Sequence, residues 1–412
     1  MPKQIFRVLM TGFFVTFFFF PALLSAQEKE PIKIGLISTL SGTYAQPGND
    51  SYNGSIFYLE KIGYMMAGRK VELIAEDEEA FPSTALAKAR KLVELNKVHV
   101  LVGPLLTNCA YAVQPYQESK RVPSLIIASA DDLTQRKRGK WSIRLCFASS
   151  QPMQPFGEYA YKVLGLRKVA VVAADYAFGW EVVGGFHKTF ENAGGKIVQK
   201  IWFPITTTDF SPYLTQLRRD ADAMFSQMGG KSAVVLNKQF QDYGLKDKMA
   251  SIGLMQITDE SILPTMGDEA LGIITAGNYS GALDNPVNKA FVKGYREKFG
   301  KVPSLFSEMH YDSMNAIHQA VTSLNGDVSN PEKLMGALKS VNLKETPRGP
   351  LKLDAYGNVI QNIYIRKVER VGGELQNTVI YTYPEVSQFW KFNPEEFLKQ
   401  PVYSRDYPPL KP

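Results

Sequence analysis

The sequence predicts an α/β protein made of two Rossmann-like lobes, each with a parallel sheet covered by helices. Short apolar strand patterns alternate with helical patterns from Lys33 onward, and βαβα repetition of this kind requires a parallel sheet with helices on both faces. The alternation starts again at Lys168, in a similar layout but with an unrelated sequence. A length of 412 residues also suits two domains with ample cores.

The N-terminal segment, residues 1–26, has the pattern of a secretion signal. Two basic residues precede an apolar run that ends at Leu24, and the small residues Ser25 and Ala26 follow. This order is typical of a cleaved signal peptide. The alternative, an uncleaved membrane anchor, usually has a longer apolar run. We therefore expect the mature protein to lie outside the cytoplasm.

The elements of the first run follow this segment. Apolar and β-branched residues predict strands at 33–39, 70–75, 98–102 and 124–128. Apolar residues at helical spacing predict helices at 53–66, 82–95 and 110–119. Pro82 suits the first turn of the second of these helices.

The second run repeats this layout. Its predicted strands cover 168–173, 196–203, 233–236 and 256–258. Its predicted helices cover 180–193, 210–221 and 239–251. Gly194 and Gly195 are a C-cap signal for the first of these helices.

Three helices, a hairpin and a tail complete the predicted elements. The helices are expected at 290–299, 307–324 and 331–341. Alternating residues from 351 to 382 predict a hairpin with a turn at Tyr356, Gly357 and Asn358. The tail, residues 384–412, is rich in Pro and aromatic residues, so we expect it to lie against the body of the protein.

Charge and cysteine content exclude some classes of protein. The formal net charge is +7 with basic and acidic residues interspersed, which is weak evidence for nucleic-acid binding, and secretion argues further against it. Cys109 and Cys146 would meet an oxidising compartment. One expectation is a disulfide between them, and the alternative is two buried thiols. No His lies near either Cys in sequence, so we expect no metal site there.

No strong catalytic signature occurs in the chain. It lacks a G-x-G-x-x-G after a strand, a G-x-x-x-x-G-K-S/T loop and a G-x-S-x-G elbow. The four His do not show the spacing of a helical metal site. We expect no enzyme, no cofactor and no metal. A secreted hydrolase with a Ser/His/Asp set that converges only in space stays an alternative.

Small hydroxylic residues follow three predicted strands of the first run. Ser41, Thr43 and Tyr44 follow the first strand, Thr107 and Asn108 stand where a strand gives way to a helix, and Ser129 follows another strand. A helix N-terminus offers free N–H groups and a partial positive charge, which suit a carboxylate. Ordinary helix capping is the alternative explanation.

Several segments together resemble the type I periplasmic solute-binding proteins of the leucine/isoleucine/valine-binding family, which feed ABC importers. The resemblance covers nearly the whole mature chain and rests on the number, order and spacing of the segments. They are IKIGLISTLSGTYAQPG, VHVLVGPLLTN, VPSLIIASADDLT, SIRLCFASSQPMQP, KVAVVAADYAFGWE, TDFSPYLTQLRRDADAMF and SEMHYDSMNAI.

The resemblance implies the type I periplasmic binding protein fold, in which two lobes joined by a three-crossing hinge hold a ligand between them. We place the crossings near 147–150, 276–279 and 349–353. Lobe 1 is then 27–148 with 280–350, and lobe 2 is 149–279 with 351–383.

The resemblance also implies roles for particular residues. In the family, a hydroxyl and main-chain N–H groups of lobe 1 bind the carboxylate of an amino acid. Thr107 and Ser129 match hydroxyl positions, and Ile127 would offer main-chain groups. Glu260 falls where the family holds the ammonium, and Phe178 stands where a Tyr of lobe 2 commonly closes over the ligand.

Other positions complete the predicted site and depart from the family. Ala80 and Leu106 stand at the positions of the family's early cysteine pair. Aromatic side chains would give the pocket an apolar lining. The predicted ligand-binding residues are Tyr44, Thr107, Asn108, Ile127, Ser129, Phe178, Phe240 and Glu260.

The predicted function is the periplasmic substrate-binding component of an ABC importer. We expect a monomer that captures a carboxylate-bearing solute, a branched-chain or aromatic amino acid, by hinge closure and then docks on a membrane permease. If Glu260 turns away from the ligand, an aromatic carboxylate such as a benzoate-like compound fits better, and an amide is a further alternative. A ligand sensor that signals to a regulatory partner is another alternative.

Overall fold

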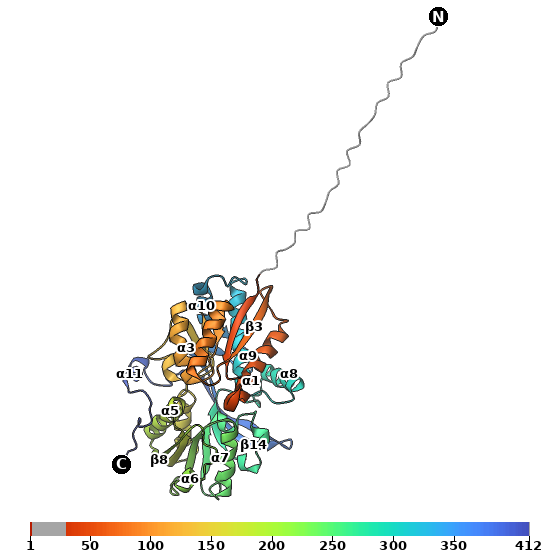
Figure 1. Ribbon diagram of the computed structural model, residues 1–412. Helices are drawn as coiled ribbons and strands as arrows, with labels where there is room; N and C mark the ends of the chain where they lie inside the picture. The colour runs from red at the N-terminus through yellow and green to blue at the C-terminus, as the bar shows by residue number, and fades with distance from the viewer. Residues whose placement is uncertain (2–29, 412) are drawn as a thin grey trace.

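The structure is a computed structural model that describes Met1 and residues 30–411. The predicted signal segment therefore lies outside the described residues, apart from Met1. Two separate sheets form the framework, one in the upper and one in the lower half of Figure 1. This arrangement confirms the predicted α/β class.

The first sheet has the strand order β2-β3-β1-β4-β5-β6. Its strands run parallel except β2, which is antiparallel to β3. The strands are β1 (Ile32–Ser38), β2 (Met65–Met66), β3 (Arg69–Asp77), β4 (Val100–Val102), β5 (Ser124–Ile126) and β6 (Ser142–Arg144).

Six helices accompany this sheet, and together with it they form what we term the first body (Figure 1). The closest pair is α1 and α9, where Gly54 lies directly against the backbone of Ser307. The helices are α1 (Ala45–Lys61), α2 (Pro82–Arg90), α3 (Thr107–Lys120), α8 (Pro286–Phe299), α9 (Leu305–Ser323) and α10 (Pro331–Lys339).

The second sheet has the order β12-β13-β14-β11-β10-β9-β7-β8, and β15 pairs with β14. Its strands are β7 (Lys168–Ala174), β8 (Lys196–Phe203), β9 (Ala223–Gln227), β10 (Ala250–Leu254), β11 (Ile274–Gly277), β12 (Asn342–Leu343), β13 (Leu351–Leu353), β14 (Val359–Val371) and β15 (Glu374–Val386). With it, the second body contains α4 (Met153–Lys162), α5 (Ala177–Ala193), α6 (Ser211–Thr215) and α7 (Gly230–Asp242).

The predicted elements of the second body were wrong between residues 210 and 258. Residues 233–236, predicted as a strand, lie inside α7, and residues 256–258 belong to a 3-10 turn, Met255–Thr258. The strands are instead β9 and β10, and the helix at 210–221 shrinks to α6. β9 (AMFSQ) lies fully buried between two parallel neighbours, so its place in the sheet outweighs its modest strand propensity.

The hairpin and the tail follow the prediction in outline. β14 pairs with both β13 and β15, and a turn containing Gly357 precedes β14. The tail contains α11 (Pro394–Lys399). Its aromatic residues Phe389, Phe397 and Tyr403 form a buried cluster, so the tail packs on the rest of the protein.

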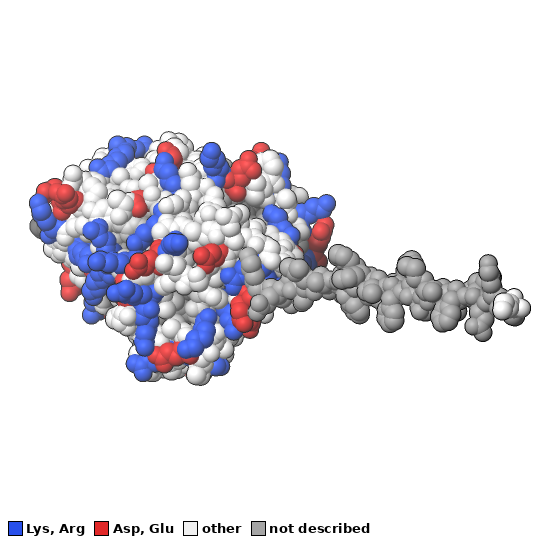
Figure 2. Space-filling model, turned by 90° about the horizontal axis from the view of Figure 1, so that it is seen from above, with Lys and Arg blue, Asp and Glu red and all other residues white. Residues whose placement is uncertain are grey.

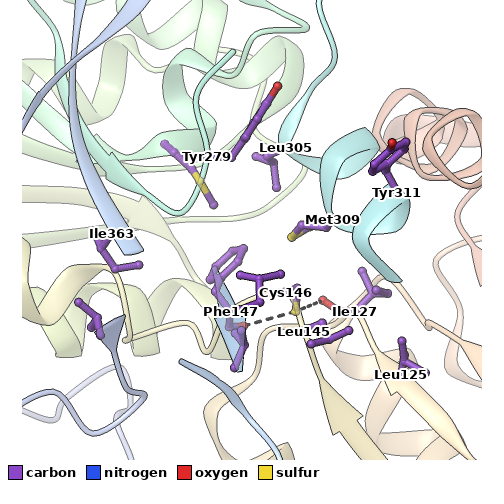
Figure 3. Close-up of a cluster of buried hydrophobic side chains, with 14 of the residues drawn as sticks. Leu125, Ile127, Leu145, Cys146, Phe147, Tyr279, Leu305, Met309, Tyr311 and Ile363 are labelled. Atoms are coloured by element: carbon purple, nitrogen blue, oxygen red, sulfur yellow. Dashed lines mark hydrogen bonds between the residues drawn. The ribbon is translucent and has the colours of Figure 1, made fainter. Parts of the chain in front are cut away.

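A buried apolar cluster lies where the two bodies meet (Figure 3). Ile127 and Leu145 directly follow β5 and β6. Leu305 and Met309 enter the cluster from α9, and Ile363 enters it from β14. The cluster therefore joins segments that are far apart in the chain.

Cys146 lies in this cluster, and the predicted disulfide is absent from the described residues. Both cysteines are free and buried. The Cys146 thiol donates to the carbonyl of Ile127 at 3.0 Å (Figure 3), whereas Cys109 packs with Val113 and Ala89 in a separate cluster. The alternative of two buried thiols is therefore confirmed, and the disulfide is ruled out because the two thiols belong to different apolar clusters.

The surface charge is mixed where Figure 2 shows it. Lys and Arg side chains are interspersed with Asp and Glu on this face, and they are denser toward the left of the view. Many basic side chains are already paired, for example Lys88 and Lys91 with Glu76. The visible face therefore has no continuous basic groove.

Candidate functional site

The loops that follow the parallel strands of both sheets meet between the two bodies. Asp131, after β5, donates its main-chain N–H to Glu181 on α5 at 3.0 Å. Asp259, after β10, accepts from the main-chain N–H of Leu305 on α9 at 3.2 Å. Ligands of open α/β sheets bind outside the carboxyl ends of the strands, so this junction is the candidate site.

Thr107 is the first residue of α3, at the carboxyl end of β4. It is 9% exposed, and no side chain caps this end of the helix. Gly103 permits the loop before it, because a side chain there would meet the carbonyl of Ile37 at 2.1 Å. The first turn of α3 therefore presents N–H groups and a hydroxyl at the carboxyl end of β4.

The Glu78 side chain fixes the loop that precedes Thr107. Its carboxylate accepts from the Thr39 hydroxyl at 2.7 Å and from the main-chain N–H of Leu106 at 3.1 Å. Burial raises the pKa of Glu78 to about 7. A buried acid thus fixes the residue just before Thr107.

Ser129 lies next to the first crossing between the bodies. The Ser149 hydroxyl donates to the Ser129 carbonyl at 2.8 Å and lies 3.4 Å from the Ser129 hydroxyl. Ile127, two residues earlier, is 3% exposed, and its carbonyl accepts from Cys146. The Ile127 side chain thus belongs to the apolar cluster, while Ser129 lies at the polar junction.

Two acids, Asp131 and Glu181, meet beside Ser129. Burial, and next the neighbouring Asp131, raise the pKa of Glu181 well above its ordinary value. Burial also raises the pKa of Asp131 to about 6. Asp131 Oδ1 accepts from the main-chain N–H of Ser150 at 3.0 Å, and Oδ2 is buried with no hydrogen-bond partner in the described part of the chain.

Aromatic side chains line the junction from both bodies. Tyr176 and Phe178 begin α5, with ring centroids 5.9 Å apart. Burial raises the pKa of Tyr176, and Tyr44 of the first body adds to this effect, which places the two tyrosines near each other. Gln227 ends β9, and its side-chain oxygen is buried without a partner among the described residues. The junction thus combines aromatic faces with polar atoms.

The Glu260 carboxylate already accepts hydrogen bonds from other groups of the protein. Its Oε1 accepts from Arg366 at 3.2 Å, from Asn377 at 3.0 Å and from the main-chain N–H of Gly281 at 3.2 Å. Arg366 is fully buried, and it also donates to the carbonyl of Tyr279 at 2.8 Å. The carboxylate therefore has a buried cation of its own.

Phe240 lies apart from this group, and Asn108 differs from its neighbour Thr107 in exposure. Phe240 packs in the core of the second body with Leu236 and Leu245, in a different cluster from Phe178. Asn108 is exposed on α3, although its neighbour Thr107 is buried. Tyr44 lies near Tyr176, whose ring contacts Phe178. Ser129 lies beside the first crossing, and Thr107 begins α3 after β4.

The sequence reasoning missed Glu181 and Gln227. Glu181 follows Phe178 by three residues on the same helix, so helical spacing could have placed both on one face. Gln227 was hidden because the predicted strand stood at 233–236, whereas the real strand ends at Gln227.

No cluster of metal-ligating side chains stands out in the described ranges. Among residues 1 and 30–411, no group of three or more His, Cys, Asp or Glu is placed to hold a metal ion. Over those same residues, no helix has the length and apolar character needed to cross a membrane.

The sequence is similar to those of known proteins over most of its length. A family model described as periplasmic binding protein matches residues 31–374. Leu/Ile/Val-binding protein homolog 6 of Brucella melitensis biotype 1 is 30% identical over 372 residues, which are 88% of this chain and 94% of that protein.

Two solved structures are similar over most of the chain. An ABC transporter substrate-binding protein from Sphaerobacter thermophilus is 34% identical with a TM-score of 0.83, covering 87% of this chain and 99% of that one. A solute-binding protein of an ABC transporter from Rhodopseudomonas palustris BisB5, in complex with 3,4-dihydroxy benzoic acid, is 33% identical with a TM-score of 0.82, covering 87% and 98%.

Proposed function

The chain belongs to the periplasmic binding protein family, and on this premise we propose a ligand class and a closing movement for it. Its place as a substrate-binding component of an ABC transporter follows from the family and from the similar solved proteins. These relatives are solute-binding proteins rather than enzymes. The permease partner and export through a cleaved signal peptide are part of the proposal.

The two bodies are the two lobes of this proposal. The chain passes to the second sheet after β6, returns to the first body after β11, and joins the second sheet again from β12 onward. The first two passages lie near the predicted crossings at 147–150 and 276–279, and the third begins shortly before the one predicted at 349–353. Lobe 1 is 27–148 with 280–350, and lobe 2 is 149–279 with 351–383. A rotation at the three crossings would open the junction to solvent and close it around a ligand.

The observation that carries the proposal is the uncapped N-terminus of α3, which follows β4 at the carboxyl end of that strand. The N–H groups of its first turn and the Thr107 hydroxyl suit a carboxylate, because charge-assisted hydrogen bonds and the helix dipole both favour an anion there. Ser129 supplies a second hydroxyl nearby. The ligand is therefore a small carboxylate, captured first by lobe 1.

The state of Glu260 favours an acid without an ammonium group. A buried ammonium needs an anion of its own, since an unpaired buried charge costs several kcal/mol. Glu260 already accepts from Arg366, Asn377 and Gly281. The aromatic rings of Tyr44, Tyr176 and Phe178 suit a planar ring, and the relative from Rhodopseudomonas palustris binds 3,4-dihydroxy benzoic acid. We favour an aromatic carboxylate.

The second candidate is a branched-chain or aromatic amino acid. The similarity to a Leu/Ile/Val-binding protein homolog supports it. An amino acid would require another anion at the junction, and Asp131, which has an unpartnered oxygen among the described residues, is a candidate.

Calorimetric titration of the mature protein separates the candidates. The ligands are benzoate, 4-hydroxybenzoate, L-leucine, L-phenylalanine and 3-phenylpropionate, which is phenylalanine without its ammonium group. Binding of 4-hydroxybenzoate or 3-phenylpropionate without binding of either amino acid is expected. Binding of phenylalanine but not of 3-phenylpropionate would overturn the aromatic-acid assignment in favour of an amino acid.

A further inference from the structure

The C-terminal tail, residues 384–411, packs against both bodies. The family model ends at residue 374, before the tail begins. In Figure 1, α11 of the tail lies at the edge of the molecule, level with the gap between α3 of the first body and α5 of the second. The tail contacts the first body through Arg136 and the second body through Gly184.

Arg136 anchors the tail to the first body. It lies between β5 and β6 and donates to the carbonyls of Leu398 at 3.2 Å, Phe397 at 3.3 Å and Gln400 at 2.8 Å. One guanidinium thus holds three carbonyls at the end of α11, where a cation is favoured. The nearby Thr134 hydroxyl adds a hydrogen bond to the Gln388 side chain at 3.0 Å.

Gly184 on α5 is the main anchor on the second body. The Tyr403 ring lies directly on this glycine, and a Cβ placed there would meet ring carbons at 2.4 Å. The Lys188 ammonium lies 5.0 Å from the centroid of the Phe397 ring. Toward the end of the chain, Lys200 donates to the Pro408 carbonyl at 2.6 Å, and Lys411 pairs with Glu191 at 2.9 Å.

We propose that the tail is a strap that ties the two bodies together and favours their closed arrangement. The inference rests on the closing movement of the proposed function, but not on the identity of the ligand. Arg136 and Gly184 belong to different bodies, so a rotation that separates the bodies must break contacts at one of them. Hydrogen bonds to charged groups are among the stronger ones in proteins, so the strap opposes opening before any ligand binds.

The test weakens each anchor separately and measures the ligand-free protein. Arg136→Ala removes the three bonds to the tail carbonyls. Gly184→Ala adds a methyl group under Tyr403 while favouring the helix itself. The control is Arg218→Ala, which removes an exposed arginine whose side chain pairs with Asp220 inside the second body. Small-angle X-ray scattering gives the radius of gyration, and circular dichroism verifies that each variant is folded.

A larger radius of gyration in both anchor variants, and an unchanged one in Arg218→Ala, is the expected result. Because the closed form is then less populated, the apparent Kd for 4-hydroxybenzoate should rise about tenfold in the anchor variants. An unchanged radius in folded Arg136→Ala, or a change there without one in Gly184→Ala, would overturn the strap. Scattering needs no ligand, so its outcome stands even if 4-hydroxybenzoate does not bind.

Discussion

At the scale of single residues, Thr107 is the most direct test of the site. Thr107→Val keeps the shape of the side chain but removes the hydroxyl at the uncapped end of α3. Loss of one charge-assisted hydrogen bond should weaken carboxylate binding about 10- to 100-fold. Calorimetric titration with 4-hydroxybenzoate measures this change.

The matched control for this variant is Thr215→Val. Thr215 is exposed on α6, far along the chain from the junction residues. The Thr215→Val variant should bind 4-hydroxybenzoate with the affinity of the wild type. If Thr107→Val and the wild type bind with equal affinity, the Thr107 hydroxyl is not part of the site. Thermal unfolding of both variants verifies that they are folded.

Glu78 predicts a pH dependence of stability. Its pKa is about 7 in the folded protein against 4.5 in a free side chain, so the folded state binds this proton more tightly than the unfolded state. The stabilisation is complete below about pH 4.5 and is lost as the pH rises through 7, and it amounts to about 3 kcal/mol. Glu78→Gln cannot ionise, so its stability relative to wild type should rise by about that amount between pH 5 and pH 8.

Urea unfolding of wild type and Glu78→Gln at both pH values measures this difference, and the contributions of other titrating groups cancel in the comparison. Glu297→Gln, at an exposed position on α8, controls for the amide substitution itself. A constant difference between wild type and Glu78→Gln across this pH range would show that Glu78 is ionised in the folded protein.

At the scale of elements, the contact of α1 with α9 depends on Gly54. A Cβ at this position would lie 2.0 Å from the carbonyl oxygen of Ser307, so Gly54→Ala must push the two helices apart. We expect a loss of about 3 kcal/mol in the free energy of unfolding. Gly336 on α10 faces open space, so Gly336→Ala should instead stabilise by roughly 0.5–1 kcal/mol. Denaturant unfolding measures both, and equal signs would contradict the packing argument.

Elements with strong local signals could be predicted from the sequence, and those set by their neighbours could not. The KVAVVAA strand and the glycine that ends α5 stand where they were expected. The segment AVVL reads as a strand by residue type, but it lies in α7 because Gly229 and Gly230 begin a helix there. That displacement concealed Gln227.

The same limit applies to the site. Thr107 and Ser129 follow short strands, so their place at the sheet edge could be predicted from local pattern. Arg366 stands 106 residues after Glu260 on a strand of the hairpin. Only the folded chain brings them together, and this pairing is the reason why we propose an acid without an ammonium group.

At the scale of the whole molecule, the crossings are fastened to one another. Arg348, fully buried before the third crossing, donates to the Leu145 carbonyl beside the first at 2.6 Å, and it lies 3.4 Å from Glu308 and 3.3 Å from Asp312 of α9. Gln361 donates to the Cys146 carbonyl at 2.8 Å. Such cross-links make a concerted rotation about one hinge more favourable than independent bending of three segments.

A ligand that bridges the two bodies should therefore both compact and stabilise the protein. At a concentration about 100 times its Kd, a ligand adds about 2.7 kcal/mol to the free energy of unfolding, which corresponds to a rise in Tm of about 3 °C for a chain of this size. The radius of gyration should fall at the same concentration, because the ligand binds the closed form better only through its contacts with Phe178 and its neighbours on lobe 2. Thermal unfolding and scattering with 4-hydroxybenzoate test both effects together. A rise in Tm with an unchanged radius would mean that the ligand binds one lobe without closing the hinge, and closure would then have to be assigned to the strap alone.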